Sequence, residues 1–162
     1  MNVRFIDTSI LVNILDIPNM NDKHSQVIEE FQAVIKDKSQ VLILPLATII
    51  ETGNHIAHIS NGEIRRQKAK RMAAFLENTA SGKAPWKYYG KELETDDLLW
   101  LAKEFPDNAM RQTGIGDLSI IRAYEKYKEE VPAIETIMIW SVDSHLSSYR
   151  EEMTMPARRK NR

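Results

Sequence analysis

The segment Val3-Arg4-Phe5-Ile6-Asp7-Thr8-Ser9 passes from a short apolar run into three polar residues. An apolar run of this length is typical of a buried strand, and Asp-Thr-Ser is typical of the cap of a following helix. Helical spacing of apolar residues continues over residues 9–15, and Pro18 ends it. The N-terminus therefore predicts a strand that runs directly into a helix, with Asp7 at the junction.

The rest of the chain alternates short apolar runs with helical patterns. Strands are predicted at residues 41–44 and 136–140, and the loop signals at residues 80–91 predict an irregular connection. Helices are predicted after a cap at Asn21 or Asp22, at residues 46–59, 63–78, 98–105 (ended by Pro106) and 114–130, with a short one after Asp143. Strands alternating with helices favour a mostly parallel sheet covered on both faces.

The composition is that of an ordinary globular protein. The chain has 162 residues, of which 43% are hydrophobic and 28% charged, and this suits one domain. It has no Cys, which excludes a disulfide framework and a thiolate metal site. No apolar run approaches the roughly 20 residues that span a membrane, and the N-terminus does not resemble a signal peptide, so we expect a cytoplasmic protein. We predict one domain over residues 1–150 and a basic tail over residues 151–162.

The charge distribution gives a local signal only, because the formal net charge is −1. Five cations fall within seven residues, and they are either a solvated helix face or contacts to RNA phosphates: Arg65, Arg66, Lys68, Lys70 and Arg71. Three aromatic residues offer a similar choice. Trp86, Tyr88 and Tyr89 either stack on RNA bases or pack their loop against the core.

Four acids fall where an open parallel sheet binds ligands, which is beyond the carboxyl ends of its strands. Asp7 directly follows the first predicted strand, and Asp143 follows the last. Asp117 opens a helix after a glycine-bearing loop, and Glu51 lies one to two turns into the helix after the second strand. We expect all four to meet at one edge of the sheet.

Helix capping is the alternative explanation for Asp7, Asp117 and Asp143, because Asp is a favoured N-cap residue. Glu51 lies too far inside its helix to be a cap, and its neighbours are two isoleucines. A carboxylate near apolar groups needs a partner or stays protonated, and four converging carboxylates repel one another. A bound divalent cation removes both difficulties.

Oxygen ligands in a chain without Cys indicate a hard cation, Mg²⁺ or Mn²⁺. Such a site suits phosphodiester hydrolysis, because the cation can activate a water and stabilise charge on the phosphate. Ser9 and Ser141 are candidate supporting residues, since a hydroxyl can orient a carboxylate next to a metal. A local hydrogen bond to the backbone is the alternative for each serine.

Glu51, Asn54, His55 and His58 share one face of the predicted helix, because offsets of 3, 4 and 7 residues return to the same side. They form either a transition-metal site or the polar lining of a cleft that touches RNA. The spacing lacks the His-Glu-x-x-His pattern of metalloproteases, which favours the lining.

Taken in order, these motifs resemble the PIN-domain family, and its VapC-type toxins in particular. The resemblance covers roughly residues 1–149, and its matching segments are Phe5-Ile6-Asp7-Thr8-Ser9, Ala47-Thr48-Ile49-Ile50-Glu51, Gly116-Asp117-Leu118-Ser119-Ile120-Ile121, and Ser141-Val142-Asp143 with Leu146. It implies a three-layer α/β/α sandwich around a mostly parallel sheet of four or five strands. It also implies Mg²⁺- or Mn²⁺-dependent cleavage of RNA by Asp7, Glu51, Asp117 and Asp143, a homodimer, and a small antitoxin protein as partner.

Two other functions compete with an endoribonuclease. One is a PIN-fold module that binds RNA or supports assembly without cleavage. The other is a DNA-directed nuclease of the related flap-endonuclease type, which usually carries more acids on a longer chain. The complete set of four acids favours the enzyme, because a non-catalytic module has no need to keep mutually repelling side chains.

Overall fold

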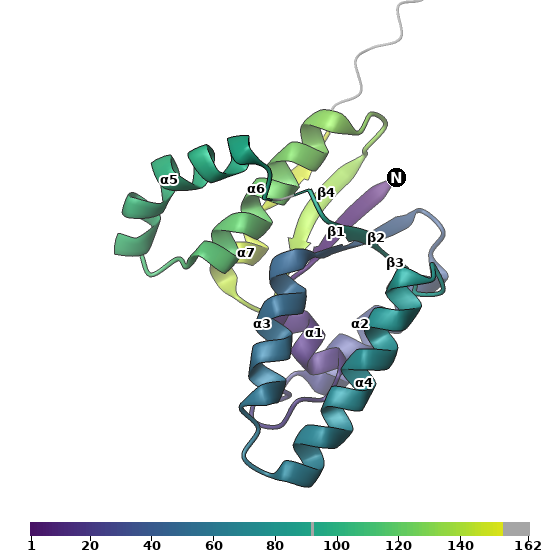
Figure 1. Ribbon diagram of the computed structural model, residues 1–162. Coiled ribbons are helices and arrows are strands. Elements are labelled where there is room, and N and C mark those ends of the chain that lie inside the picture. Colours follow the sequence, from purple (N-terminus) through teal and green to yellow (C-terminus); the bar gives the residue numbers. More distant parts are fainter. Residues whose placement is uncertain (92, 154–162) are drawn as a thin grey trace, which may run out of the picture.

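The computed structural model describes residues 1–91 and 93–153. In this part of the chain, five strands form one sheet in the order β3-β2-β1-β4-β5 (Figure 1). Strands β1 to β4 pair in parallel, and β5 pairs antiparallel with β4 at one edge. The strands are β1 (Asn2–Ile6), β2 (Gln40–Pro45), β3 (Trp86–Tyr89), β4 (Thr136–Trp140) and β5 (Arg150–Glu152). The helices are α1 (Thr8–Ile14), α2 (His24–Lys36), α3 (Leu46–Ala57), α4 (Gly62–Ala80), α5 (Thr95–Met110), α6 (Ile115–Glu130) and α7 (Ser144–Ser147).

The apolar runs predicted as buried strands form the middle of the sheet. Strand β1 lies between β2 and β4, with Phe5 in register with Ile43 and Ile139. Successive side chains of a strand point to opposite faces, so these three residues belong to one hydrophobic core and Ile6 to the other. Both faces are buried, which is why the central strands are continuous apolar runs rather than alternating ones.

The two hydrophobic cores lie on opposite faces of the sheet. One contains apolar residues of α1, α2 and α4, and the other contains those of α5, α6 and α7. Figure 1 shows α1, α2 and α4 on one side of the sheet and α5 and α6 on the other. Helix α3 contacts both α1 and α6. The prediction of a three-layer α/β/α sandwich with a mostly parallel sheet is confirmed.

The carboxyl ends of β1 and β4 lie together at one edge of the sheet, because these strands are parallel neighbours. The N–H of Asp7, the residue after β1, donates to the carbonyl of Trp140 at the end of β4 (3.1 Å). Helix α1 begins at the next residue, and α3 begins directly after β2 at the same edge. This edge therefore gathers the ends of strands and the first turns of helices.

The irregular connection expected at residues 80–91 contains strand β3, which the sequence did not predict. The Trp86 ring stacks on Phe75 at 4.3 Å, and its indole N–H donates to Thr79 Oγ1 (2.8 Å). Tyr89 is buried and meets Phe5 edge-on. Trp86 and Tyr89 therefore pack against the core, whereas Tyr88 is exposed. A four-residue strand with aromatic and charged side chains lacks the apolar run by which the other strands were recognised.

Helix α5 is longer than the expected residues 98–105, because it continues through Pro106 to Met110. Pro106 lacks the N–H that would bond to the carbonyl of Ala102, but both residues are exposed, so water can bind that carbonyl. The first turn is anchored to α6 by the fully buried Asp97, which accepts from Arg122 Nε (2.8 Å) and Lys126 Nζ (2.7 Å). The prediction that Pro106 ends this helix was wrong.

The sheet extends past the predicted domain boundary at residue 150. Strand β5 pairs Glu152 with Thr136, and Met153 packs against the hydrophobic core. Residues 151–153 thus belong to the folded domain, and the remainder of the predicted basic tail, residues 154–162, lies outside the described residues. Among the described helices, none combines the length and apolar character needed to cross a membrane.

Candidate active site

The four predicted acids line one cavity, of about 360 Å³, at the carboxyl edge of the sheet. Asp7 comes from the end of β1, Glu51 from α3, Asp117 from α6, and Asp143 from the loop after β4. The structure therefore brings the acids together from four separate elements, as expected.

Asp7 is 3% exposed and accepts hydrogen bonds from both predicted supporting serines. Ser9 Oγ (2.7 Å) and Ser141 Oγ (2.8 Å) donate to Asp7 Oδ2, and the Ser9 N–H (3.3 Å) makes Asp7 the N-cap of α1. Each serine oxygen in turn accepts a backbone N–H, from Val142 at Ser9 (3.1 Å) and from Asp143 at Ser141 (2.9 Å). The serines fix Asp7 and tie it to the segment that carries Asp143. Capping and a place in the cavity thus coexist at Asp7.

Glu51 is oriented from both sides. The hydroxyl of Thr8 donates to Oε2 (2.6 Å). The other oxygen lies against Gly116, because a Cβ added there would overlap Oε1 and come within 2.8 Å of Cδ. A side chain at residue 116 would therefore displace the carboxylate of Glu51 from its place against the N-terminus of α6. The roles of Thr8 and Gly116 were not predicted, although both residues lie beside acids in the sequence motifs.

Asp117 is the third residue of α6, whose N-cap is Gly114, so the capping explanation does not apply to it. Burial raises the pKa of Asp117 to about 6, reinforced by repulsion from Asp7, Glu51 and Asp143 and opposed by His145. The electrostatic fields of the four acids therefore overlap at Asp117.

Asp143 is exposed and does cap a helix. Its Oδ1 accepts the N–H groups of His145 (2.8 Å) and Leu146 (3.1 Å) at the start of α7. The capping explanation offered for Asp143 is thus confirmed, while the residue also lines the cavity. As at Asp7, a helix cap holds a carboxylate at the edge of the site.

A divalent cation fits the donor chemistry of this cavity, although the side chains are not gathered around one point. In the described parts of the chain, no three His, Asp or Glu side chains form a cluster that could hold a metal. Asp7 Oδ2 and Glu51 Oε2 bond to hydroxyl groups instead. Carboxylate oxygens and the raised pKa of Asp117 nevertheless mark a place where positive charge is favoured.

The cavity has a fifth acid, Asp22, that the sequence offered only as a helix cap. Helix α2 begins at His24, and its N-cap is Lys23, so the predicted cap at Asn21 or Asp22 was wrong. The buried Asn13 places this segment, since its Oδ1 accepts the N–H of Lys23 (3.1 Å). A polar residue on a mostly apolar helix was the available signal for Asn13.

The polar face of α3 divides between two cavities. His55 lines the carboxylate cavity, one turn beyond Glu51, as predicted for polar lining of the cleft. His58 lines a neighbouring cavity, which His55 also borders. Glu51, His55 and His58 thus do not surround a common point, as a shared metal ion would require.

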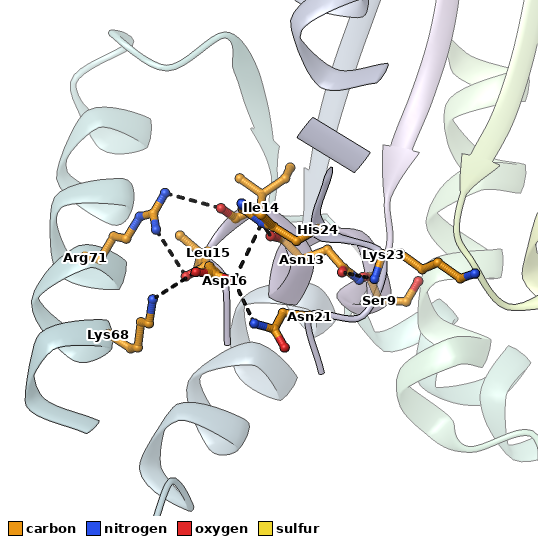
Figure 2. A network of polar contacts seen from close by, with 10 residues as sticks. All are labelled: Ser9, Asn13, Ile14, Leu15, Asp16, Asn21, Lys23, His24, Lys68 and Arg71. Atoms are coloured by element: carbon orange, nitrogen blue, oxygen red, sulfur yellow. Dashed lines mark hydrogen bonds and ion pairs between the residues drawn. The ribbon is translucent and has the colours of Figure 1, made fainter. Parts of the chain in front are cut away.

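Two of the five cations of α4 attach this helix to the C-terminal end of α1. Arg71 donates to the carbonyls of Ile14 and Leu15 (both 3.3 Å), and Lys68 pairs with Asp16 (3.8 Å). Figure 2 shows both side chains reaching from α4 to this point. These cations have a structural role that their sequence cluster did not reveal.

The other three cations of α4 are exposed. Arg65 donates to the carbonyl of Ile59 (3.0 Å) just before its own helix. None of the five described side chains lines the carboxylate cavity. Contact between RNA and this cluster stays a prediction, and Arg66 and Lys70 are exposed members of it.

Comparison with known proteins gives a structural likeness and no match in sequence. No protein-family model matches the sequence, and no curated protein matches it. Among solved structures, the chain is similar to VapBC2 from Rickettsia felis bound to a DNA fragment from their promoter. The two are 12% identical, the match covers 86% of this chain and 99% of that chain, and the TM-score is 0.48. A likeness of this size carries no functional conclusion, so the function has to be argued from the cavity itself.

Proposed function

We propose that this protein is a metal-dependent endoribonuclease that hydrolyses phosphodiester bonds of RNA. The supporting observation is that Asp7, Glu51, Asp117 and Asp143 line one cavity and repel one another enough to help raise the pKa of Asp117. Mutually repelling carboxylates lower the stability of the protein without a bound cation. Perturbed pKa values of this kind gather at functional sites. A cation-binding role explains the arrangement better than a purely structural one.

Asp7, Glu51, Asp117 and Asp143 would hold Mg²⁺ or Mn²⁺, which prefer oxygen ligands. When bound, the cation supplies activation of water and neutralisation of charge on the phosphate. The protein's own contribution is to orient these ligands: Ser9 and Ser141 fix Asp7, and Thr8 fixes Glu51. Asp117 would have to be deprotonated to hold the cation, so we expect binding to weaken below about pH 6.

RNA as the substrate is proposed from the PIN-like order of the four motifs, not from the shape of the cavity. The same resemblance underlies the proposed antitoxin partner and the homodimer. The homodimer stays a prediction, and light scattering of the purified protein would give the molar mass that tests it.

The decisive experiment compares cleavage of labelled single-stranded RNA and DNA of one sequence by the wild type, Asp7→Asn and Asp117→Asn, with Mn²⁺ and with EDTA. We expect the wild type to cleave the RNA with Mn²⁺ but not with EDTA, and we expect neither site variant to cleave it. Asp107→Asn is a matched control, because Asp107 is an exposed acid of α5. Equal cleavage by the wild type and both site variants, or cleavage that survives EDTA, would rule out the mechanism.

The non-catalytic alternative predicts a different result in the same assay. A PIN-fold module would bind the RNA and leave it uncut under all conditions. For the toxin role, we expect a small neighbouring reading frame whose product co-purifies with this protein and inhibits its cleavage of RNA. Full activity in the presence of that product would contradict the toxin role but leave the nuclease intact.

A further inference from the structure

A second cavity, of about 320 Å³, adjoins the carboxylate cavity. It lies between the loop after α1, the C-terminal end of α3 and the N-terminal end of α4. Met20 and His55 line both cavities, so the two are neighbours that share a wall. A ligand chain that crosses the carboxylate cavity can therefore continue into the second cavity past these two side chains.

The second cavity differs in chemistry from the first. Among the described residues, no Asp or Glu lines it. Its apolar wall includes Ile17, Ile59 and Ile64, and its polar groups include the imidazoles of His55 and His58. A flat apolar ring with polar edges suits such a lining, because apolar walls with a few placed polar groups are typical of small-ligand pockets.

The ring of His58 is already oriented by the protein. Its Nδ1 lies 2.7 Å from the carbonyl oxygen of Asn54, which can only accept, so Nδ1 carries the proton of this hydrogen bond. In the neutral ring, Nε2 is then an acceptor. A nucleobase offers matching donors, which are the exocyclic amino groups of adenine, cytosine and guanine and the N3–H of uracil.

One wall of the second cavity is preformed. Asp16 and Asn19, in the loop after α1, have left-handed backbone conformations, with φ values of 56° and 65°. Asn21 Nδ2 donates to Asp16 Oδ1 (2.7 Å), and Lys68 pairs with Asp16 from α4 (3.8 Å). Figure 2 shows these contacts converging on Asp16. The hydrogen bond from Asn21, with help from nearby cations, lowers the pKa of Asp16, which keeps the ion pair charged. A wall fixed during folding needs no ordering when a ligand binds.

From these features we infer that the second cavity binds an unpaired nucleobase of the RNA strand, one that flanks the phosphate in the carboxylate cavity. This inference rests on the proposed function, since it names a base-binding subsite of the same substrate. The base packs against the isoleucines of the wall, and His58 Nε2 accepts from an N–H group on its edge. His55 marks the passage between the base and the phosphate.

The test measures RNA binding without cleavage. Fluorescein-labelled decamers of adenylate, cytidylate and uridylate, and an abasic decamer, are titrated with Asp117→Asn protein in EDTA, and anisotropy reports the affinity. In this background, His58→Ala removes the acceptor and Ser60→Trp fills the cavity from its loop wall. Asn54→Ala is the matched control, because it lies on the same helix, is exposed and keeps the carbonyl that His58 uses. Unfolding curves confirm that each variant is folded.

We expect both cavity variants to weaken binding of the adenylate, cytidylate and uridylate decamers by about five- to tenfold. The abasic decamer, which has no base to place in the cavity, should be insensitive to both substitutions. Equal affinities of all variants, equal losses for the abasic decamer, or no measurable binding of any decamer would overturn the inference.

The result can be separated from the proposed catalysis, because neither cation nor cleavage enters the binding assay. Base-dependent binding by the Asp117→Asn protein, together with a wild type that does not cleave RNA, would support the subsite and contradict the nuclease. Cleavage by the wild type, together with unchanged binding of all four decamers when His58→Ala or Ser60→Trp is added to Asp117→Asn, would contradict the subsite alone.

Discussion

The carboxylate of Glu51 occupies the space in which a side chain at Gly116 would begin. We predict that Gly116→Ala moves this carboxylate out of the cavity and lowers RNA cleavage by roughly 10- to 100-fold, as small displacements of catalytic groups do. The free energy of unfolding should change little, by about 1 kcal/mol or less, because the overlapping atoms are the flexible end of Glu51. Cleavage rates and urea unfolding measure the two effects.

Gly53→Ala is the control for this prediction. Gly53 lies on the same helix as Glu51, and a Cβ added there meets nothing within 4 Å. Alanine is a better helix former, so this variant should be slightly more stable and fully active. A Gly116→Ala enzyme with wild-type activity would show that the position of Glu51 does not matter for cleavage.

The pKa of Asp117 predicts how stability depends on pH. Its folded value of about 6 lies above the ordinary 3.8, so between these values the folded protein binds more protons than the unfolded chain. Stability in EDTA therefore falls as pH rises through this window. We expect Asp117→Asn to be more stable than the wild type above about pH 7, by about 1 to 2 kcal/mol after screening of this half-buried group, and equal to it below about pH 4.

Urea unfolding of both proteins across this pH range checks the sign. Asp107→Asn again serves as the control and should follow the wild type at every pH. A wild type that gains stability over Asp117→Asn with rising pH would mean that the carboxylate has a favourable partner.

Cation binding should reverse this destabilisation. We predict that Mn²⁺ raises the melting temperature of the wild type near neutral pH and raises that of Asp117→Asn much less, since a ligand that binds only the folded state stabilises it more when it binds more tightly. The increment should shrink below about pH 6, where Asp117 holds its proton. Equal increments for both proteins would place the bound cation elsewhere.

The hydroxyls of Ser9 and Ser141 both donate to Asp7 Oδ2, so each can partly replace the other. We expect Ser9→Ala and Ser141→Ala each to lower the free energy of unfolding by about 1 kcal/mol, and the double variant to lose more than the sum. Ser147→Ala, at an exposed serine of α7, should change neither stability nor cleavage. Strict additivity would argue against a shared role of the two serines at Asp7.

The cations of α4 should divide into two groups. Arg71→Ala removes the donor to the carbonyls of Ile14 and Leu15, so we expect a loss of about 1 kcal/mol in stability. Arg66→Ala and Lys70→Ala should leave stability unchanged, weaken RNA binding and make its salt dependence shallower, because each removes at most one phosphate contact. Unfolding curves and binding at several salt concentrations separate the groups, and an unchanged salt slope would exclude phosphate contact by Arg66 and Lys70.

Several features of the fold and the cavity were predictable because their signals are local. The apolar runs that became β1, β2 and β4 follow from burial on both faces of a parallel sheet. Asp7 and Asp143 were placed correctly because Asp7 directly follows β1 and Asp143 lies in the short loop after β4, and both also cap a helix, as the sequence allowed.

Other features were missed because they depend on distant partners. Strand β3 forms only because β2 offers a free edge and Phe75 offers a surface for Trp86. Pro106 stays within α5, whose first turn is anchored through Asp97. Asp22 reaches the cavity because Asn13 holds the segment before α2.

The sequence by itself determined which acids are present, the order of most strands and helices, and the edge of the sheet where the acids lie. Periodicity, caps and chain direction are properties of neighbouring residues, so they can be read along the chain. Only the tertiary structure decided that Glu51 lies against Gly116 and that Asp117 carries a raised pKa. It also decided that Lys68 and Arg71 bind Asp16 and Leu15 at the C-terminal end of α1. Those properties arise from side chains on different elements that come within a few ångströms of one another, and no local pattern encodes such distances.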